Sequence, residues 1–108
     1  MGLLAGKNDL KLLEETKEGR NINRHYYSNE EIAEEVQRPV VKSLLNLFSF
    51  RNQSDAFDLE GTIDIETPTA YSIVIKRQNK DKSVTAVAEI DLQGQTYRVT
   101  ENGIEVIF

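Results

Sequence analysis

A change of periodicity near the middle of the chain constrains its fold more than any other feature. From about Asp9 to Asn52, apolar side chains recur at helical spacing, and from about Leu59 to Phe108 they alternate with polar ones. Alternation is typical of strands that bury one face of a sheet. Helices followed by a run of strands predict an α+β fold with an antiparallel sheet in the second half.

Capping and breaking residues divide the first half into three helices. The first is expected over residues 9–18, with Asp9 as N-cap and Gly19 as the C-terminal stop. The capping box Ser28–Glu31 should begin a second, short helix, and Pro39 should occupy the first turn of a third. A wide apolar stripe on the third helix predicts that it packs against a large surface; its members are Val40, Val41, Leu44, Leu45, Leu47 and Phe48.

Turn residues divide the second half into four or five strands in a meander. Pro68 ends the first alternating run, and residues 79–82 form a polar turn. The longest one-sided strand is expected from Val84 to Leu92. Asn102-Gly103 predicts a hairpin, because both central positions of the favoured two-residue turn have positive φ.

Composition excludes several classes of protein. The 108 residues contain no cysteine, so disulfides, thiolate nucleophiles and cysteine-based zinc sites are absent. No apolar run approaches the roughly 20 residues that span a bilayer, and the first six residues do not resemble a signal peptide. The net charge of −5 disfavours nucleic acid and anionic membranes as partners. These features favour a cytoplasmic protein.

No catalytic, metal-binding or cofactor-binding motif is recognisable. The chain has one histidine, no G-x-S-x-G elbow and no glycine-rich phosphate loop, so we expect neither a metal nor a cofactor. His25 has no clustered acidic neighbours in the sequence, and an isolated histidine is more often structural or solvated than a ligand.

The segment Gly19–Tyr27 is unusual because it concentrates arginine, histidine and tyrosine where secondary-structure signals are weak. An arginine fork suits phosphate or carboxylate, and tyrosine and histidine can bind hydroxyl-rich ligands. The alternative is that the tyrosines pack the loop and the arginines pair with glutamates. Composition alone favours this second interpretation.

Several motifs, in order along the chain, resemble the C-terminal part of bacterial sucrose phosphorylases. They are Gly2–Asp9, Gly19–Tyr27, Arg38–Val41, Phe50–Asn52 and Ala56-Phe57. The resemblance implies an origin in an alpha-amylase-superfamily enzyme, with a (β/α)8 barrel followed by an antiparallel β domain. Residues 1–52 would then be the last βα loop and helices of the barrel, and residues 53–108 the C-terminal β domain. The apolar stripe of the third helix would pack on the barrel sheet.

The resemblance also implies a reaction, in which glucose passes from sucrose to phosphate with retention, giving glucose 1-phosphate and fructose. The nucleophile and the acid/base carboxyl of such enzymes lie on earlier barrel strands, so this chain is not expected to be catalytic alone. It further implies that Arg24 contributes to the acceptor subsite for phosphate or fructose, with His25 as a weaker candidate. One alternative stays open, a stand-alone binding or assembly module derived from such an enzyme. A carbohydrate-binding β domain is disfavoured, because the chain has no tryptophan and no evident row of solvent-facing aromatic residues. We also expect the chain by itself to form a homo-oligomer.

Overall fold

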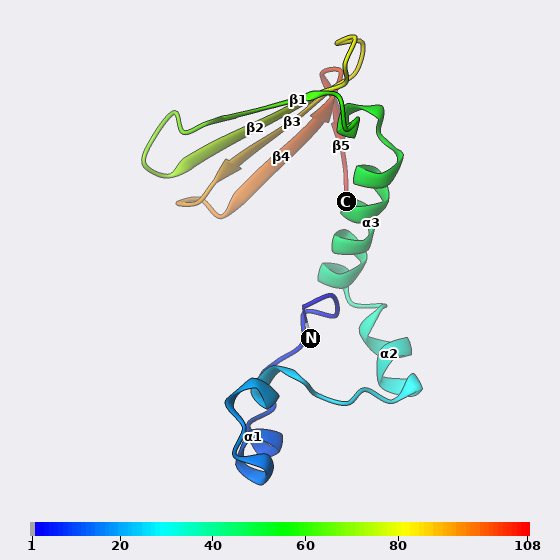
Figure 1. Cartoon of the computed structure of the whole chain (residues 1–108), viewed down its shortest axis with the longest axis vertical. Coiled ribbons are helices and arrows are strands. Elements are labelled where there is room, and N and C mark those ends of the chain that lie inside the picture. Colours follow the sequence, from blue (N-terminus) through cyan, green and yellow to red (C-terminus); the bar gives the residue numbers. More distant parts are fainter. Residues whose placement is uncertain (1) are drawn as a thin grey trace. The chain divides into compact units, whose positions relative to one another are not determined.

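The computed structural model describes residues 2–108 and contains helices in the first half and one sheet in the second (Figure 1). The predicted α+β order is confirmed. The chain divides into two compact units, Met1–Phe48 with Phe108, and Ser49–Ile107. Within the described residues, no helix is long and apolar enough to cross a membrane.

Helix α1 (Leu10–Thr16) begins as expected but ends earlier. The Asp9 side chain accepts a hydrogen bond of 2.9 Å from the Leu12 N–H, which confirms the predicted N-cap. The predicted stop at Gly19 is wrong, because Lys17 already adopts the left-handed conformation, and its N–H donates to the Leu13 carbonyl. Gly19 instead begins the 3-10 helix η1 (Gly19–Asn23).

Helices α2 (Asn29–Glu35) and α3 (Pro39–Gln53) begin where the sequence predicts. The Ser28 hydroxyl accepts from the Glu31 N–H at 3.1 Å, and the Glu31 carboxylate accepts from the Ser28 N–H at 2.7 Å. Both bonds of the capping box are therefore formed. Pro39 is the first residue of α3, where its missing N–H leaves no helical bond unmade.

The apolar stripe of α3 is only partly covered. Val41 is completely buried, whereas Val40 is 53% exposed and Phe48 45% exposed. Exposing a large apolar side chain rather than burying it costs about 1.5–3 kcal/mol. The expectation that this helix lies against a large surface is therefore not met by the described residues alone.

We predict that the 108-residue chain self-associates through this helix, since a symmetric dimer is the commonest way to cover such a stripe. The double substitution Leu44→Glu with Phe48→Glu should shift the chain toward monomer or unfold it, because each adds a charge to the stripe. Asn46→Glu with Ser49→Glu is the matched control at exposed polar positions of α3. Sedimentation and thermal melting are the measurements. A monodisperse monomer at high concentration, unchanged by the stripe substitutions, contradicts the prediction.

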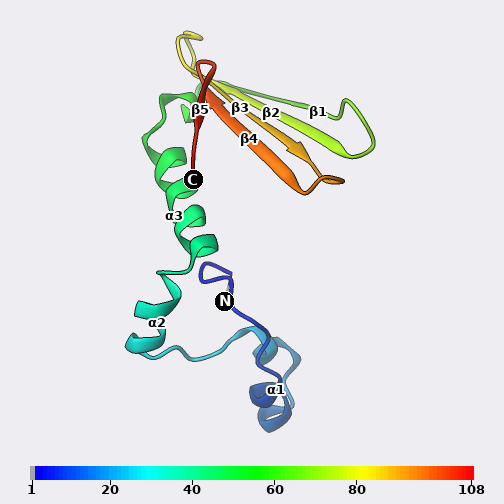
Figure 2. The same cartoon turned by 180° about the vertical axis from the view of Figure 1, so that it is seen from behind.

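The sheet is an antiparallel meander in the order β1-β2-β3-β4-β5 (Figure 2). Its strands are β1 (Thr62–Glu66), β2 (Ser72–Gln78), β3 (Thr85–Asp91), β4 (Thr96–Glu101) and β5 (Ile104–Val106). The expected strand Val84–Leu92 is thus one residue shorter at each end. Asn102 and Gly103 have φ values of 49° and 82°, which confirms the predicted hairpin.

Strand register gathers apolar side chains on one face of the sheet. Directly paired residues share a face, and one such row crosses all five strands: Ile65, Ile75, Ala88, Val99 and Val106. Ala86 and Val99 are buried, whereas every residue of the edge strand β1 is exposed. The central strands therefore hold the core of this unit.

The 3-10 helix η2 (Asp55–Phe57) is anchored to the sheet by aromatic and cationic contacts. The guanidinium groups of Arg51 and Arg77 lie over the Phe57 ring, at 5.8 and 5.7 Å from its centroid. Arg77 also donates to the Asp58 carbonyl at 3.1 Å. These contacts fix the chain where it enters β1.

Candidate functional site

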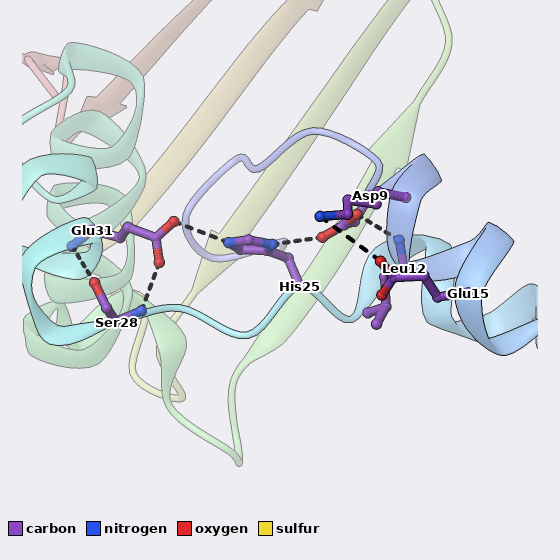
Figure 3. A network of polar contacts seen from close by, with 7 residues as sticks. Asp9, Leu12, Glu15, His25, Ser28 and Glu31 are labelled. Carbon is purple, nitrogen blue, oxygen red and sulfur yellow. Dashed lines mark hydrogen bonds and ion pairs between the residues drawn. The ribbon is translucent and has the colours of Figure 1, made fainter.

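The most organised cluster of polar side chains surrounds His25, in the segment between η1 and α2 (Figure 3). Its Nδ1 lies 2.7 Å from Asp9 Oδ2, and its Nε2 lies 3.1 Å from Glu31 Oε1. The two carboxylates approach the imidazole from opposite sides, so the ring bridges the start of α1 and the first turn of α2.

Both carboxylates are held in place by the helix starts to which they belong. Asp9 accepts from the Leu12 N–H, and its own N–H donates to the Ile22 carbonyl at 2.6 Å. Glu31 bonds His25 with one oxygen and the Ser28 N–H with the other. The partners of His25 are thus positioned by N-terminal capping rather than by a deep core.

The pKa values of the three groups shift in the directions that favour their charged forms. The hydrogen bond that the ring donates to Asp9, and next the one that it donates to Glu31, raises the pKa of His25. The Leu12 N–H, followed by His25, lowers the pKa of Asp9, and the Ser28 N–H, followed by His25, lowers the pKa of Glu31. All three are partly exposed, so solvent screens these interactions.

An open pocket of about 520 Å³ lies beside this cluster. Its polar side chains are Lys7, Asp9, His25, Tyr27, Glu31, Glu35 and Arg38. Arg38 forms an ion pair with Glu35, and the same nitrogen lies within 3.4 Å of the carbonyls of Leu4 and Ala5. The pocket is therefore lined by both acidic and basic groups, and His25 pairs with Asp9 and Glu31 as Arg38 does with Glu35.

Arg24 and His25 are neighbours in sequence but have different environments. Arg24 is exposed, and within residues 2–108 its guanidinium forms no hydrogen bond or ion pair. His25 instead has carboxylates on both ring nitrogens, and the Tyr27 ring meets it edge-on at 4.7 Å. Arg20, the other arginine of this segment, pairs with Glu18.

The expectation that His25 lacks acidic partners is wrong. Asp9 and Glu31 lie 16 and 6 residues away in sequence, and both were recognisable only as helix-capping residues. The available signal was that two capped helix starts flank the histidine, each with a carboxylate fixed near its first turn. No group of three or more acidic or histidine side chains in the described part of the chain could hold a metal ion.

Comparison with known proteins shows which proteins the chain resembles. No protein-family profile matches the chain. It is 70% identical over all 108 residues to a sucrose phosphorylase of Streptococcus mutans. This chain is homologous to the C-terminal part of sucrose phosphorylases.

Two further relatives support the same family. A sucrose 6(F)-phosphate phosphorylase of Thermoanaerobacterium thermosaccharolyticum is 43% identical over 111 aligned residues, 98% of this chain. The crystal structure of a sucrose 6F-phosphate phosphorylase from Thermoanaerobacter thermosaccharolyticum matches 99% of this chain with a TM-score of 0.85 and 40% identity. The chain spans only about 22% of the length of each of these sucrose phosphorylase homologues.

Proposed function

We propose that this chain is the C-terminal part of a sucrose phosphorylase, which transfers glucose from sucrose to phosphate with retention. The observation that carries the proposal is 70% identity over the whole chain to 22% of the Streptococcus mutans enzyme. The relatives differ in the donor that their names state, sucrose or sucrose 6(F)-phosphate. The higher identity to the sucrose enzyme favours sucrose as the donor.

In this proposal, residues 1–52 are the last βα loop and helices of a (β/α)8 barrel, and residues 53–108 are the C-terminal β domain. The half-exposed stripe of α3 supports it, because an outer barrel helix buries such a stripe on the barrel sheet. The segment between η1 and α2 would then lie among the loops at the carboxyl ends of the strands, where such barrels build their active sites.

Arg24 is the residue to which we assign binding of phosphate in the acceptor subsite. Its guanidinium is exposed and has no partner among residues 2–108, so it is available to an anion. His25 is less available, because both ring nitrogens are already bonded to carboxylates. Sucrose, phosphate and fructose are accordingly the proposed ligands of the whole enzyme.

A graft tests the proposal. This chain should replace the C-terminal 22% of the Streptococcus mutans sucrose phosphorylase, and the product should be assayed for glucose 1-phosphate release from sucrose and phosphate. We expect the rate of phosphorolysis to lie within about tenfold of that of the parent enzyme. This corresponds to a change of at most about 1.4 kcal/mol in the activation free energy. A folded graft without activity contradicts the proposal and favours the stand-alone binding or assembly module.

Arg24→Ala in the active graft should lower phosphorolysis by about 10- to 100-fold, the range expected for losing a hydrogen bond to a charged group. Hydrolysis of the glucosyl-enzyme by water should fall much less, since an acceptor-site cation acts mainly on the anion. Arg20→Ala is the control, because Arg20 already pairs with Glu18. Equal losses in hydrolysis and phosphorolysis contradict the acceptor role and indicate donor binding or structural support.

A further inference from the structure

Hydrogen bonding around His25 requires both ring nitrogens to be donors. Ionised carboxylates only accept, and a neutral imidazole carries a single N–H. The contacts of Nδ1 to Asp9 at 2.7 Å and of Nε2 to Glu31 at 3.1 Å are therefore both satisfied only by the imidazolium. The geometry therefore favours the protonated, imidazolium form of His25.

We propose that Asp9, His25 and Glu31 form a proton-dependent clasp, in which His25 is a positioning residue that fixes segment 24–27 between the starts of α1 and α2. Through this segment, the clasp joins the start of α1 to the first turn of α2. Arg24 directly precedes the clasped residue, so the clasp limits the positions that its guanidinium can reach. Only the effect on turnover rests on the proposed function.

The structure indicates which side of the clasp opens when the proton leaves. The contact to Asp9 is the shorter one, and the Asp9 side chain is 22% exposed against 47% for Glu31. The remaining N–H should therefore stay on Nδ1 and keep its bond to Asp9. The Nε2 lone pair would then face the Glu31 carboxylate and repel it, while Ser28 keeps Glu31 within its capping box.

The charged surroundings of the clasp do not supply a competing switch near neutral pH. Tyr27 contacts the ring, and Lys7, Glu35 and Arg38 line the same pocket. Glu35 and Arg38 are paired with each other. The chain has one histidine and no cysteine, so His25 is the side chain whose ordinary pKa lies closest to neutrality.

The direction of the pH dependence follows from the pKa shifts. The pKa of His25 is raised above its ordinary 6.5, so its contribution is complete below 6.5 and is lost as the pH rises through the raised value. The pKa values of Asp9 and Glu31 are lowered from 3.8 and 4.5, so their contribution is complete above those values and is lost on acidification. The clasp should therefore be closed from about pH 4.5 to the raised pKa of His25.

Because the chain has a single histidine, NMR titration of its ring tests the clasp without overlap. In the 108-residue chain we expect the pKa of His25 to lie above 6.5. Glu31→Gln should shift it down, because the amide carries no charge but can accept from an N–H or donate to a bare nitrogen. Glutamine also suits the capping box, so α2 should persist. Glu30→Gln removes the same charge one residue away. It should leave the pKa of His25 nearly unchanged, because the carboxylates on the two ring nitrogens belong to Asp9 and Glu31.

Amide exchange in residues 24–27 gives a second measurement. As the pH rises through the pKa that the titration gives for His25, exchange corrected for its intrinsic base dependence should accelerate in the unmodified chain and in Glu30→Gln, but not in Glu31→Gln. Asp9→Asn provides an independent variant, because asparagine is an equally good N-cap and α1 should persist; it should also shift the pKa of His25 down. An unshifted pKa in the unmodified chain, or equal shifts in Glu30→Gln and Glu31→Gln, would overturn the clasp.

Turnover separates failure of the clasp from failure of the proposed function. In the active graft, Glu31→Gln should flatten the alkaline fall of kcat/KM for phosphate while changing KM more than kcat. If the graft is inactive but the NMR results are as expected, the proposed function is refuted and the proposed clasp is supported. If the graft is active but the pKa of His25 is not raised, the proposed clasp is refuted and the proposed function is supported.

Discussion

No glucose 1-phosphate is expected when the 108-residue chain alone is incubated with sucrose and phosphate. Retaining glucosyl transfer needs one carboxylate as nucleophile and a second carboxyl as acid and base, about 5–5.5 Å apart across the reacting bond. The two carboxylates of the His25 cluster, Asp9 and Glu31, are both bonded to the same histidine and held by helix caps. Neither is free to attack a sugar.

The measurement is a coupled assay for glucose 1-phosphate on protein purified from a host without sucrose phosphorylase. The active graft in the same assay shows that the substrates and detection work. Adding the truncated Streptococcus mutans partner to the separate chain extends the test, because recovery of activity would demonstrate assembly of the two parts. Turnover by the chain alone, at a rate proportional to its concentration, would refute the expectation.

Gly61→Ala should strongly destabilise the sheet unit. A Cβ at this position would lie 2.1 Å from the Gln78 carbonyl oxygen and 3.1 Å from both Asn79 Cα and the Asp58 carbonyl oxygen. All three are backbone atoms, so no side-chain rotation relieves the clash. Overpacking of this severity should cost about 3 kcal/mol or more, against a total stability of roughly 5–15 kcal/mol for a typical domain.

For a unit of this size, a loss of about 3 kcal/mol corresponds to a fall in Tm of roughly 12–24 °C. Gly19→Ala is the control, because nothing lies within 4 Å of its added carbon. Gly103→Ala has the same open space but a φ of 82°, so it separates backbone strain from steric overlap. Thermal melting followed by circular dichroism measures all three. A Tm for Gly61→Ala equal to that of the Gly19 control would contradict the close approach.

The sequence alone determined the elements whose signals lie within a few residues. The Asp9 cap, the capping box at Ser28, the helix start at Pro39 and the Asn102-Gly103 hairpin are each encoded locally, and the structure confirms each of them. Alternation of apolar residues also predicted the meander, because sequential antiparallel strands need only short turns. The motifs quoted above were specific enough to indicate the homology that the comparisons confirm.

Only the tertiary structure decided which local features meet. The path of the chain through η1, which has no periodicity to read, brings Asp9 and Glu31 onto opposite sides of His25. Lys17 ends α1 in the left-handed conformation, although the sequence predicts that Gly19, two residues later, ends this helix. The approach of Gly61 to Gln78 likewise depends on how β1 pairs with β2. Capping and turn preferences act within one or two turns of the backbone, whereas these contacts depend on chain paths of up to 17 residues that no local preference specifies.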